Sequence, residues 1–134
     1  MMMKLLIDSH IFLWLLFSPE KISPATLSLI QNRQHSVYIS SVSFWELSLK
    51  YGLGKISFSG VLPEELPGWA NKLGLEVLAL DAEIASSIHQ MPKYHNDPFD
   101  RMIIHTAIQN QLTLVSRDRA FSAYLQDGLI GLLH

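Results

Sequence analysis

Cysteine is absent from the 134 residues of this sequence. Disulfide bonds and metal sites built from thiolates are therefore excluded. A chain of this length can bury roughly two-thirds of the surface that it exposes when unfolded, so it can fold on a hydrophobic core alone. The absence of cysteine agrees with a reducing compartment, and we expect a cytoplasmic protein.

An excess of basic charge is also missing. Ten Lys and Arg residues stand against twelve Asp and Glu residues, which gives a formal net charge of -2. Any binding of nucleic acid must therefore use a local patch rather than a basic tail. Hydrophobic residues make up 49% of the chain. This composition predicts a core of several layers, or an apolar surface that a partner covers.

No long hydrophobic run interrupts this pattern. The longest unbroken apolar run, residues 11–17, is far shorter than the roughly 20 residues that a membrane-spanning helix needs. Asp8 and His10 divide the apolar N-terminal segment, and no small-residue cleavage site follows before Pro19. We therefore interpret the segment as a buried strand followed by a helix, and we expect no membrane contact.

Strand-like and helix-like segments alternate along the chain. Short apolar runs predict strands at residues 3–7, 37–39, 76–80, 112–115 and 129–133. Capping residues, prolines and glycines predict helices at 10–17 (capped by Ser9), 24–33, 41 or 43 to about 54, 63–73, 82–89, 98–109 and 118–125, with a loop or hairpin at 55–62. This order predicts one α/β domain over residues 1–134, with a central parallel sheet of four or five strands and helices on both faces.

Acidic residues stand where such a sheet places a site, at the carboxyl ends of its strands. Asp8 directly follows the first strand, and Glu46 lies about one turn into the helix after the second. Asp100 begins the helix before the fourth strand, and Asp118 follows that strand, with Ser116 between. We expect these four acids to converge on one crevice as its catalytic and metal-binding residues.

Carboxylates packed together repel one another unless one is protonated or a cation joins them. Ligands that offer only oxygen suit Mg²⁺ or Mn²⁺ rather than zinc. Such ions activate water and stabilise the leaving oxygen of a phosphodiester. The four acids therefore predict hydrolysis by water that a metal activates.

Helix capping offers a simpler reading for three of these acids. In the segment 97–100, Asp97 is a good N-cap and Asp100 the third helical residue; the segment 43–46 matches a capping box; Asp118 suits a short helix. Asp8 has no such role in this interpretation, because a charge at the end of an apolar strand is costly to bury without a partner. The four acids together favour a site over four separate caps.

Other polar residues add a weaker signal. Arg101, Arg117 and Arg119 flank the acids and could contact phosphates; we select Arg101 and Arg119, with Ser116, as candidate substrate-binding residues. Lys50 stands four residues after Glu46, as in an ordinary helix ion pair. The six histidines form no His-x-x-x-His pair, which argues against zinc, and most are interpreted as surface or core residues.

Four blocks of the sequence resemble the motifs of PIN domains, in order and over nearly the whole chain. They are Leu-Leu-Ile-Asp-Ser-His at 5–10, Ile-Ser-Ser at 39–41 followed by Trp-Glu-Leu at 45–47, His-Asn-Asp-Pro-Phe-Asp-Arg-Met-Ile-Ile at 95–104, and Leu-Val-Ser-Arg-Asp at 114–118. The third block has the form seen in VapC-type toxins and is the most specific of the four.

The resemblance implies a parallel sheet between two helical layers and cleavage of RNA that depends on Mg²⁺ or Mn²⁺. It implies the toxin of a type II toxin–antitoxin pair, inhibited by a cognate antitoxin protein, and commonly a homodimer. The acidic ligands of the family map onto Asp8, Glu46, Asp100 and Asp118. Ser116 stands where a Thr is frequent and keeps the hydroxyl group.

Two other functions remain open at this point. A non-catalytic PIN-fold module would bind RNA or protein without cutting, although four intact acids argue against it. A phosphotransfer domain of the receiver or phosphatase kind also places acids after parallel strands. His10 stands where a phosphatase of the dehalogenase type has its second Asp, and only the predicted cap Asp81 follows the third strand.

Overall fold

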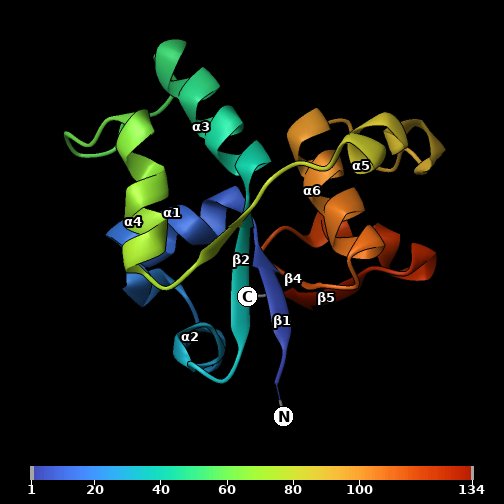
Figure 1. The fold of residues 1–134 in the computed structure, drawn as a ribbon, viewed down its shortest axis with the longest axis horizontal. Helices are drawn as coiled ribbons and strands as arrows, with labels where there is room; N and C mark the ends of the chain where they lie inside the picture. The colour runs from blue at the N-terminus through green and yellow to red at the C-terminus, as the bar shows by residue number, and fades with distance from the viewer. Residues whose placement is uncertain (1, 134) are drawn as a thin grey trace.

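The computed structural model describes residues 2–133 and consists of strands that alternate with helices (Figure 1). Short 3-10 helices are labelled η. The elements in chain order are β1 (Lys4–Ile7), α1 (Ser9–Phe17), η1 (Pro19–Lys21), α2 (Pro24–Gln31), β2 (Ser36–Ser40), α3 (Ser41–Gly52), η2 (Pro63–Glu65), α4 (Leu66–Lys72), β3 (Glu76–Leu78), α5 (Ala82–Ser86), η3 (Ile88–Gln90), α6 (Pro98–Gln109), β4 (Thr113–Ser116), η4 (Arg119–Asp127) and β5 (Ile130–Leu133).

The five strands form one sheet in the order β3-β2-β1-β4-β5, and every neighbouring pair is parallel. The predicted parallel α/β sheet is confirmed, with five strands. The chain builds outward from β1 to β3 and then returns to β4 on the other side of β1. In open parallel sheets this reversal of strand order opens a crevice at the carboxyl ends of the strands. Here the crevice lies between β1 and β4.

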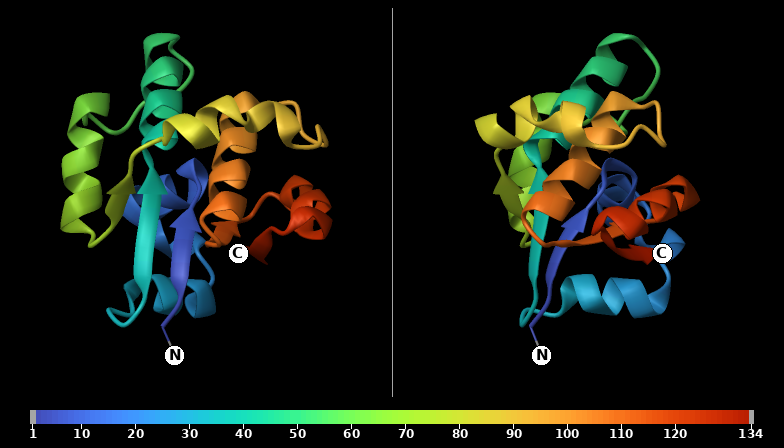
Figure 2. Two further views of the ribbon diagram at one scale, coloured as in Figure 1. Left: turned by 45° about the vertical axis from the view of Figure 1, so that its right-hand side comes forward. Right: turned by 90° about the vertical axis from the view of Figure 1, so that its right-hand side faces the viewer.

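Helices cover both faces of the sheet, which confirms the three layers (Figures 1 and 2). Side chains of β1 alternate between the faces, as strand geometry requires. Leu5 and Ile7 join a core with α1, α2 and α4, whereas Leu6 joins a second core with α6 and η4. All three side chains are fully buried. The central strand is therefore held rigidly where it delivers Asp8 to its carboxyl end.

Two helix starts differ from the prediction. Asp8, not Ser9, is the N-cap of α1, since its Oδ1 accepts a hydrogen bond of 2.8 Å from the backbone N–H of Ile11. The interpretation that Asp8 has no capping role is therefore wrong. α3 begins at Ser41 behind the N-cap Ser40, and Ser43 caps nothing. Ser9 and Ser43, which do not cap a helix, are both buried. The hydroxyl of Ser9 donates a hydrogen bond to Glu46 instead.

The remaining differences concern element lengths. Residues 63–73 form η2 and then α4 rather than one helix. The α-helix predicted at 82–89 ends at Ser86 and is followed by the 3-10 helix η3. The third strand ends at Leu78. Residues 55–62 form a loop, as predicted. Among residues 2–133, no helix is both long enough and apolar enough to cross a membrane. His134, one of the six histidines considered above, lies outside the described residues.

Candidate active site

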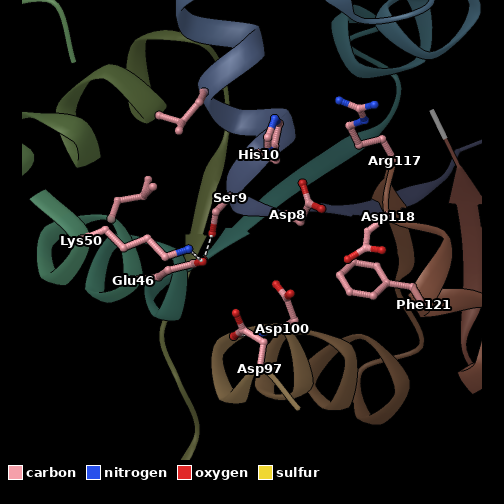
Figure 3. Close-up of a pocket in the computed structure, with 12 residues that line it drawn as sticks. Asp8, Ser9, His10, Glu46, Lys50, Asp97, Asp100, Arg117, Asp118 and Phe121 are labelled. Carbon is pink, nitrogen blue, oxygen red and sulfur yellow. Dashed lines mark hydrogen bonds and ion pairs between the residues drawn. The ribbon is translucent and has the colours of Figure 1, made fainter. Parts of the chain in front are cut away.

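A cavity of about 190 Å³ lies at the carboxyl end of β1, and we call it the acidic cavity (Figure 3). The four predicted acids all line it, although they come from four separate parts of the chain. Asp8 follows β1, Glu46 lies on α3, Asp100 lies on α6, and Asp118 follows β4. The convergence expected from the strand ends is therefore present.

Asp8 lines this cavity and is only 5% exposed. Burial raises the pKa of its carboxyl group to about 6; hydrogen bonds from Ser116 and from the Ile11 N–H work against the rise, and the carboxylates of Glu46 and Asp118 add to it. Two donors thus hold the side chain in place, but they do not neutralise it. A cation in the cavity would further stabilise the ionised form of Asp8.

Glu46 is bound through both of its carboxylate oxygens. The hydroxyl of Ser9 donates to Oε1 at 2.6 Å, and the ammonium of Lys50 donates to Oε2 at 2.6 Å. The predicted ion pair is confirmed, while the capping-box reading of Glu46 is wrong because Ser40 caps α3. Burial opposes the charge of Lys50, yet the contact with Glu46 outweighs it and raises the pKa of the ammonium.

Asp100 lies in the first turn of α6, opposite Glu46. Burial raises the pKa of its carboxyl group to about 7, and the carboxylates of Asp97, Glu46 and Asp8 add to the rise, while His95 opposes it. Within residues 2–133, no Lys or Arg side chain forms an ion pair with Asp100. The one charged partner recorded for its carboxylate among these residues is His95, whose Nε2 lies 3.4 Å from Oδ2.

Asp97 and Asp118 are helix caps that also line the acidic cavity. Oδ1 of Asp97 accepts from the N–H groups of Phe99 and Asp100 at 2.8 and 3.1 Å, so its predicted capping role is confirmed. Oδ1 of Asp118 accepts from the N–H of Ala120 at 2.9 Å. In both residues the capping bonds use Oδ1, so a cap and a metal ligand are compatible in one side chain.

His95 is a site residue that the sequence interpretation missed. Its Nε2 lies 3.4 Å from Oδ2 of Asp100 and 3.5 Å from Oδ2 of Asp118. Its Nδ1 accepts a hydrogen bond of 3.0 Å from the N–H of Asp97, which leaves the proton of a neutral ring on Nε2, facing the two acids. The sequence feature that could have indicated this role is the position of His95, which opens the block 95–104 and stands five residues before Asp100.

Two groups of side chains could hold a divalent cation. His95, Asp100 and Asp118 form one, and Glu46, Asp97 and Asp100 form the other; in each, the ligand atoms lie within 4.8 Å of one another. Asp100 belongs to both. The donors are mainly carboxylate oxygens, and burial, with a further contribution from neighbouring carboxylates, raises the pKa values of Asp8 and Asp100. These residues fit Mg²⁺ or Mn²⁺.

The candidate substrate-binding residues are placed differently. Ser116 is buried; its hydroxyl contacts Asp8 and accepts from the N–H of Asp118 at 3.0 Å, so it positions two acids. Arg101 donates to the carbonyl of Met91 at 3.3 Å. Neither it nor Arg119 lines the acidic cavity. Substrate binding by these three residues stays a prediction. Arg117, which was not among the predicted substrate-binding residues, does line the cavity.

Comparison with known proteins agrees with this geometry. The model of the PIN domain family matches residues 5–124, so the chain belongs to the PIN domain family. It is 25% identical to Ribonuclease VapC22 of Mycobacterium tuberculosis (strain ATCC 25618 / H37Rv) over 126 residues, which are 92% of this chain and 93% of that protein.

Solved structures share the fold. This chain resembles a protein chain of the DNA-bound VapBC structure from Salmonella typhimurium, with a TM-score of 0.68, 22% identity and 98% of each chain covered. It also resembles one in the structure of FitAcB from Neisseria gonorrhoeae, with a TM-score of 0.67, 24% identity and 96% of each chain covered. At such identities the likeness shows the fold alone.

Proposed function

We propose that this protein is a Mg²⁺- or Mn²⁺-dependent endoribonuclease and the toxin of a toxin–antitoxin pair. The observation that carries the proposal is the convergence of Asp8, Glu46, Asp100 and Asp118 on one cavity at the end of β1. Membership of the PIN domain family and similarity to Ribonuclease VapC22 support RNA as the substrate. The chain as a whole would act as one PIN domain.

The four acids would hold one or two divalent ions. When bound, such an ion lowers the pKa of water and stabilises charge on the leaving oxygen of a phosphodiester. The neighbouring residues set the geometry. Ser9 and Lys50 fix Glu46 on α3, and Ser116 fixes Asp8 and Asp118 across the β1–β4 crevice. These contacts preorganise the ligands on rigid elements, as metal-dependent catalysis requires.

The proposed partners are a cognate antitoxin protein and a second copy of the chain, in addition to RNA. The VapBC structure named above supports an antitoxin by analogy, although the likeness itself concerns the fold. Large apolar side chains are exposed on and after α3, including Trp45 and Leu53 at about 60%. Surfaces of this kind commonly mark protein interfaces. The expected cytoplasmic location stays a prediction.

A cleavage assay tests the proposal. The purified protein should cut single-stranded RNA in Mg²⁺ or Mn²⁺, lose this activity in EDTA, and regain it when metal is restored. Asp8→Asn should be inactive yet folded, because Asn caps a helix about as well as Asp. RNA that the parent protein binds but leaves intact with either metal would instead favour the non-catalytic binding module.

A further inference from the structure

A second cavity of about 210 Å³ adjoins the acidic cavity, and we call it the Trp14 cavity. His10 and Leu13 line both cavities, so the two lie side by side at the start of α1. The Trp14 cavity has five apolar or aromatic side chains, among them Trp14, and three serines, among them Ser57. Half of its lining residues are therefore aromatic, and its serines carry hydroxyl groups that can donate or accept hydrogen bonds.

Arg117 lies where the two cavities meet. Its side chain lines the acidic cavity, and its guanidinium carbon lies 4.8 Å from the centre of the Trp14 ring. The ring of His10 meets Trp14 edge-on at 4.9 Å. In Figure 3, Arg117 and His10 lie on the side of Asp8 away from Asp97 and Asp100. The guanidinium is thus held against an aromatic face while Arg117 remains exposed.

Arg117 is also the cation of the acidic cavity that has no acidic partner. The other one, Lys50, is bound to Glu46 at 2.6 Å. In the part of the chain that the structure describes, Arg117 forms no ion pair, although Asp118 is its neighbour in sequence. An exposed guanidinium beside a metal-binding acidic centre is suited to an anion, and its planar fork matches a phosphate.

We infer that Arg117 binds the phosphate next to the one that is cleaved, and that the adjoining nucleotide of a single-stranded RNA lies in the Trp14 cavity. Proteins bind single strands through basic groups that follow the backbone and aromatic surfaces that accept bases. Arg117 supplies the first and the Trp14 cavity the second, directly beside the acids. The inference rests on the proposed function and adds the direction in which the substrate leaves the catalytic centre.

The test measures RNA binding apart from cleavage. In an Asp100→Asn background, a short fluorescein-labelled RNA is titrated in Mg²⁺ at several salt concentrations, and a gel checks that it stays intact. Arg117→Met should weaken binding and reduce the slope of log K against log salt by about 0.7, the value for one phosphate contact on a single strand. Arg33→Met, an exposed arginine between α2 and β2, should keep the parent slope.

A second variant isolates the nucleotide pocket. Ser57→Trp places a bulky side chain at an exposed position of the Trp14 cavity. It should weaken binding about fivefold or more, in the range of one lost base stack, without changing the salt slope. Ser28→Trp, an exposed position on α2, is the matched control and should bind as the parent. Melting curves establish that each variant is folded.

A parent-like salt slope for folded Arg117→Met would overturn the inference, and so would a loss confined to Arg119→Met. Unchanged RNA binding in Arg117→Met and Ser57→Trp, together with weaker self-association in sedimentation, would identify the surface as a protein interface and also overturn it. Failure of the proposed function is a separate result, because it appears as a parent protein that cuts no RNA with either metal.

Discussion

Glu46 and Asp100 face each other across the acidic cavity, and their carboxylates differ in their hydrogen-bond and ion-pair partners. On α3, the Ser9 hydroxyl and the Lys50 ammonium each bind one oxygen of Glu46 at 2.6 Å. On α6, Asp100 has no Lys or Arg partner among the described residues, and burial with neighbouring carboxylates raises the pKa of its carboxyl group to about 7. Glu46 is thus paired with a cation of its own helix, whereas Asp100 is available to bind a cation from solution.

This difference indicates which wall is ordered before metal arrives. Glu46 is fixed by side chains of its own helix and of α1, so it is in place in the metal-free protein. Asp100 belongs to both groups of side chains that could hold a cation, the one with His95 and Asp118 and the one with Glu46 and Asp97. We therefore expect Asp100 to govern metal affinity, and Glu46 to contribute to both the metal site and the stability of the fold.

The largest expected effect comes from exchanging each acid for its amide. Asp100→Asn should reduce RNA cleavage about a hundredfold or more, since even outer partners of metal ligands commonly cost ten- to a hundredfold. Without metal, its melting temperature should equal or exceed that of the parent, because repulsion is relieved. Glu46→Gln should instead lose about 1–2 kcal/mol of stability, because Lys50 loses its counter-charge. Equal stability changes in the two variants would remove the proposed contrast.

Metal and pH should act mainly through Asp8 and Asp100. Their pKa values in the folded protein, about 6 and about 7, exceed the ordinary value of 3.8, so the folded state binds these protons more tightly than the unfolded state. Stability from these groups is therefore present below pH 4 and is lost as the pH rises to about 7. The difference in urea midpoint between parent and Asp100→Asn, measured from pH 4 to 8, isolates the contribution of Asp100.

Mg²⁺ should reverse that loss, because it binds the ionised carboxylates of the folded state. At a concentration 100 times the dissociation constant, it should add about 2.7 kcal/mol to the free energy of unfolding. The gain should be small at pH 5 and full at pH 8. A metal-induced rise in melting temperature that does not depend on pH would exclude Asp8 and Asp100 as the principal ligands.

Lys50→Met removes the ammonium partner of Glu46 on α3, so that Glu46, like Asp100 on α6, has no Lys or Arg partner among the described residues. The metal-free protein should become less stable, because the buried Glu46 loses its cation. Affinity for Mn²⁺ should increase about threefold to tenfold, since a positive charge near the ion is worth roughly 1 kcal/mol at high effective dielectric. Calorimetric titration measures the change, with exposed Lys55→Met as the control. An affinity equal to that of the parent would show that Lys50 does not compete with the metal.

The smallest effect is expected at Asp97, the N-cap of α6. Asp97→Asn should keep the cap, the stability and most of the cleavage activity, because Asn caps about as well as Asp; Asp97→Ala should lose about 0.5–2 kcal/mol. Thermal melting and cleavage of RNA by both variants provide the measurement. If Asp97→Asn melts normally but is as inactive as Asp100→Asn, then Asp97 is a metal ligand as well as a cap.

Sequence patterns predicted what depends on strand ends and missed what depends on side-chain packing. The four acids could be predicted because parallel strands end at one edge, whatever the details between them. The orientation of the His95 ring depends on a hydrogen bond that the Asp97 N–H donates to Nδ1. The orientation of Arg117 depends on the face of Trp14, more than 100 residues away in sequence. No local periodicity encodes either contact.

The capping errors have a related cause. Ser9, Ser40 and Ser43 are equally good caps by residue type, and Asp8 is another. Which one caps depends on where the strand delivers the chain, and in the fold Asp8 and Ser40 occupy those places. Ser9 is then free to donate to Glu46, 37 residues away. Asp8 is thus both a helix cap and a residue of the site, whereas these two roles are alternatives in the interpretation of the sequence.

Mn²⁺ binding tests most directly whether the acidic cavity is a metal centre. Free Mn²⁺ is followed by electron paramagnetic resonance while the parent, Asp100→Asn and the exposed cap variant Asp81→Asn are titrated at pH 8. The parent and Asp81→Asn should bind one or two ions per chain with the same affinity, and Asp100→Asn should lose that binding. Binding by Asp100→Asn with the stoichiometry and affinity of the parent would contradict a metal centre organised around Asp100.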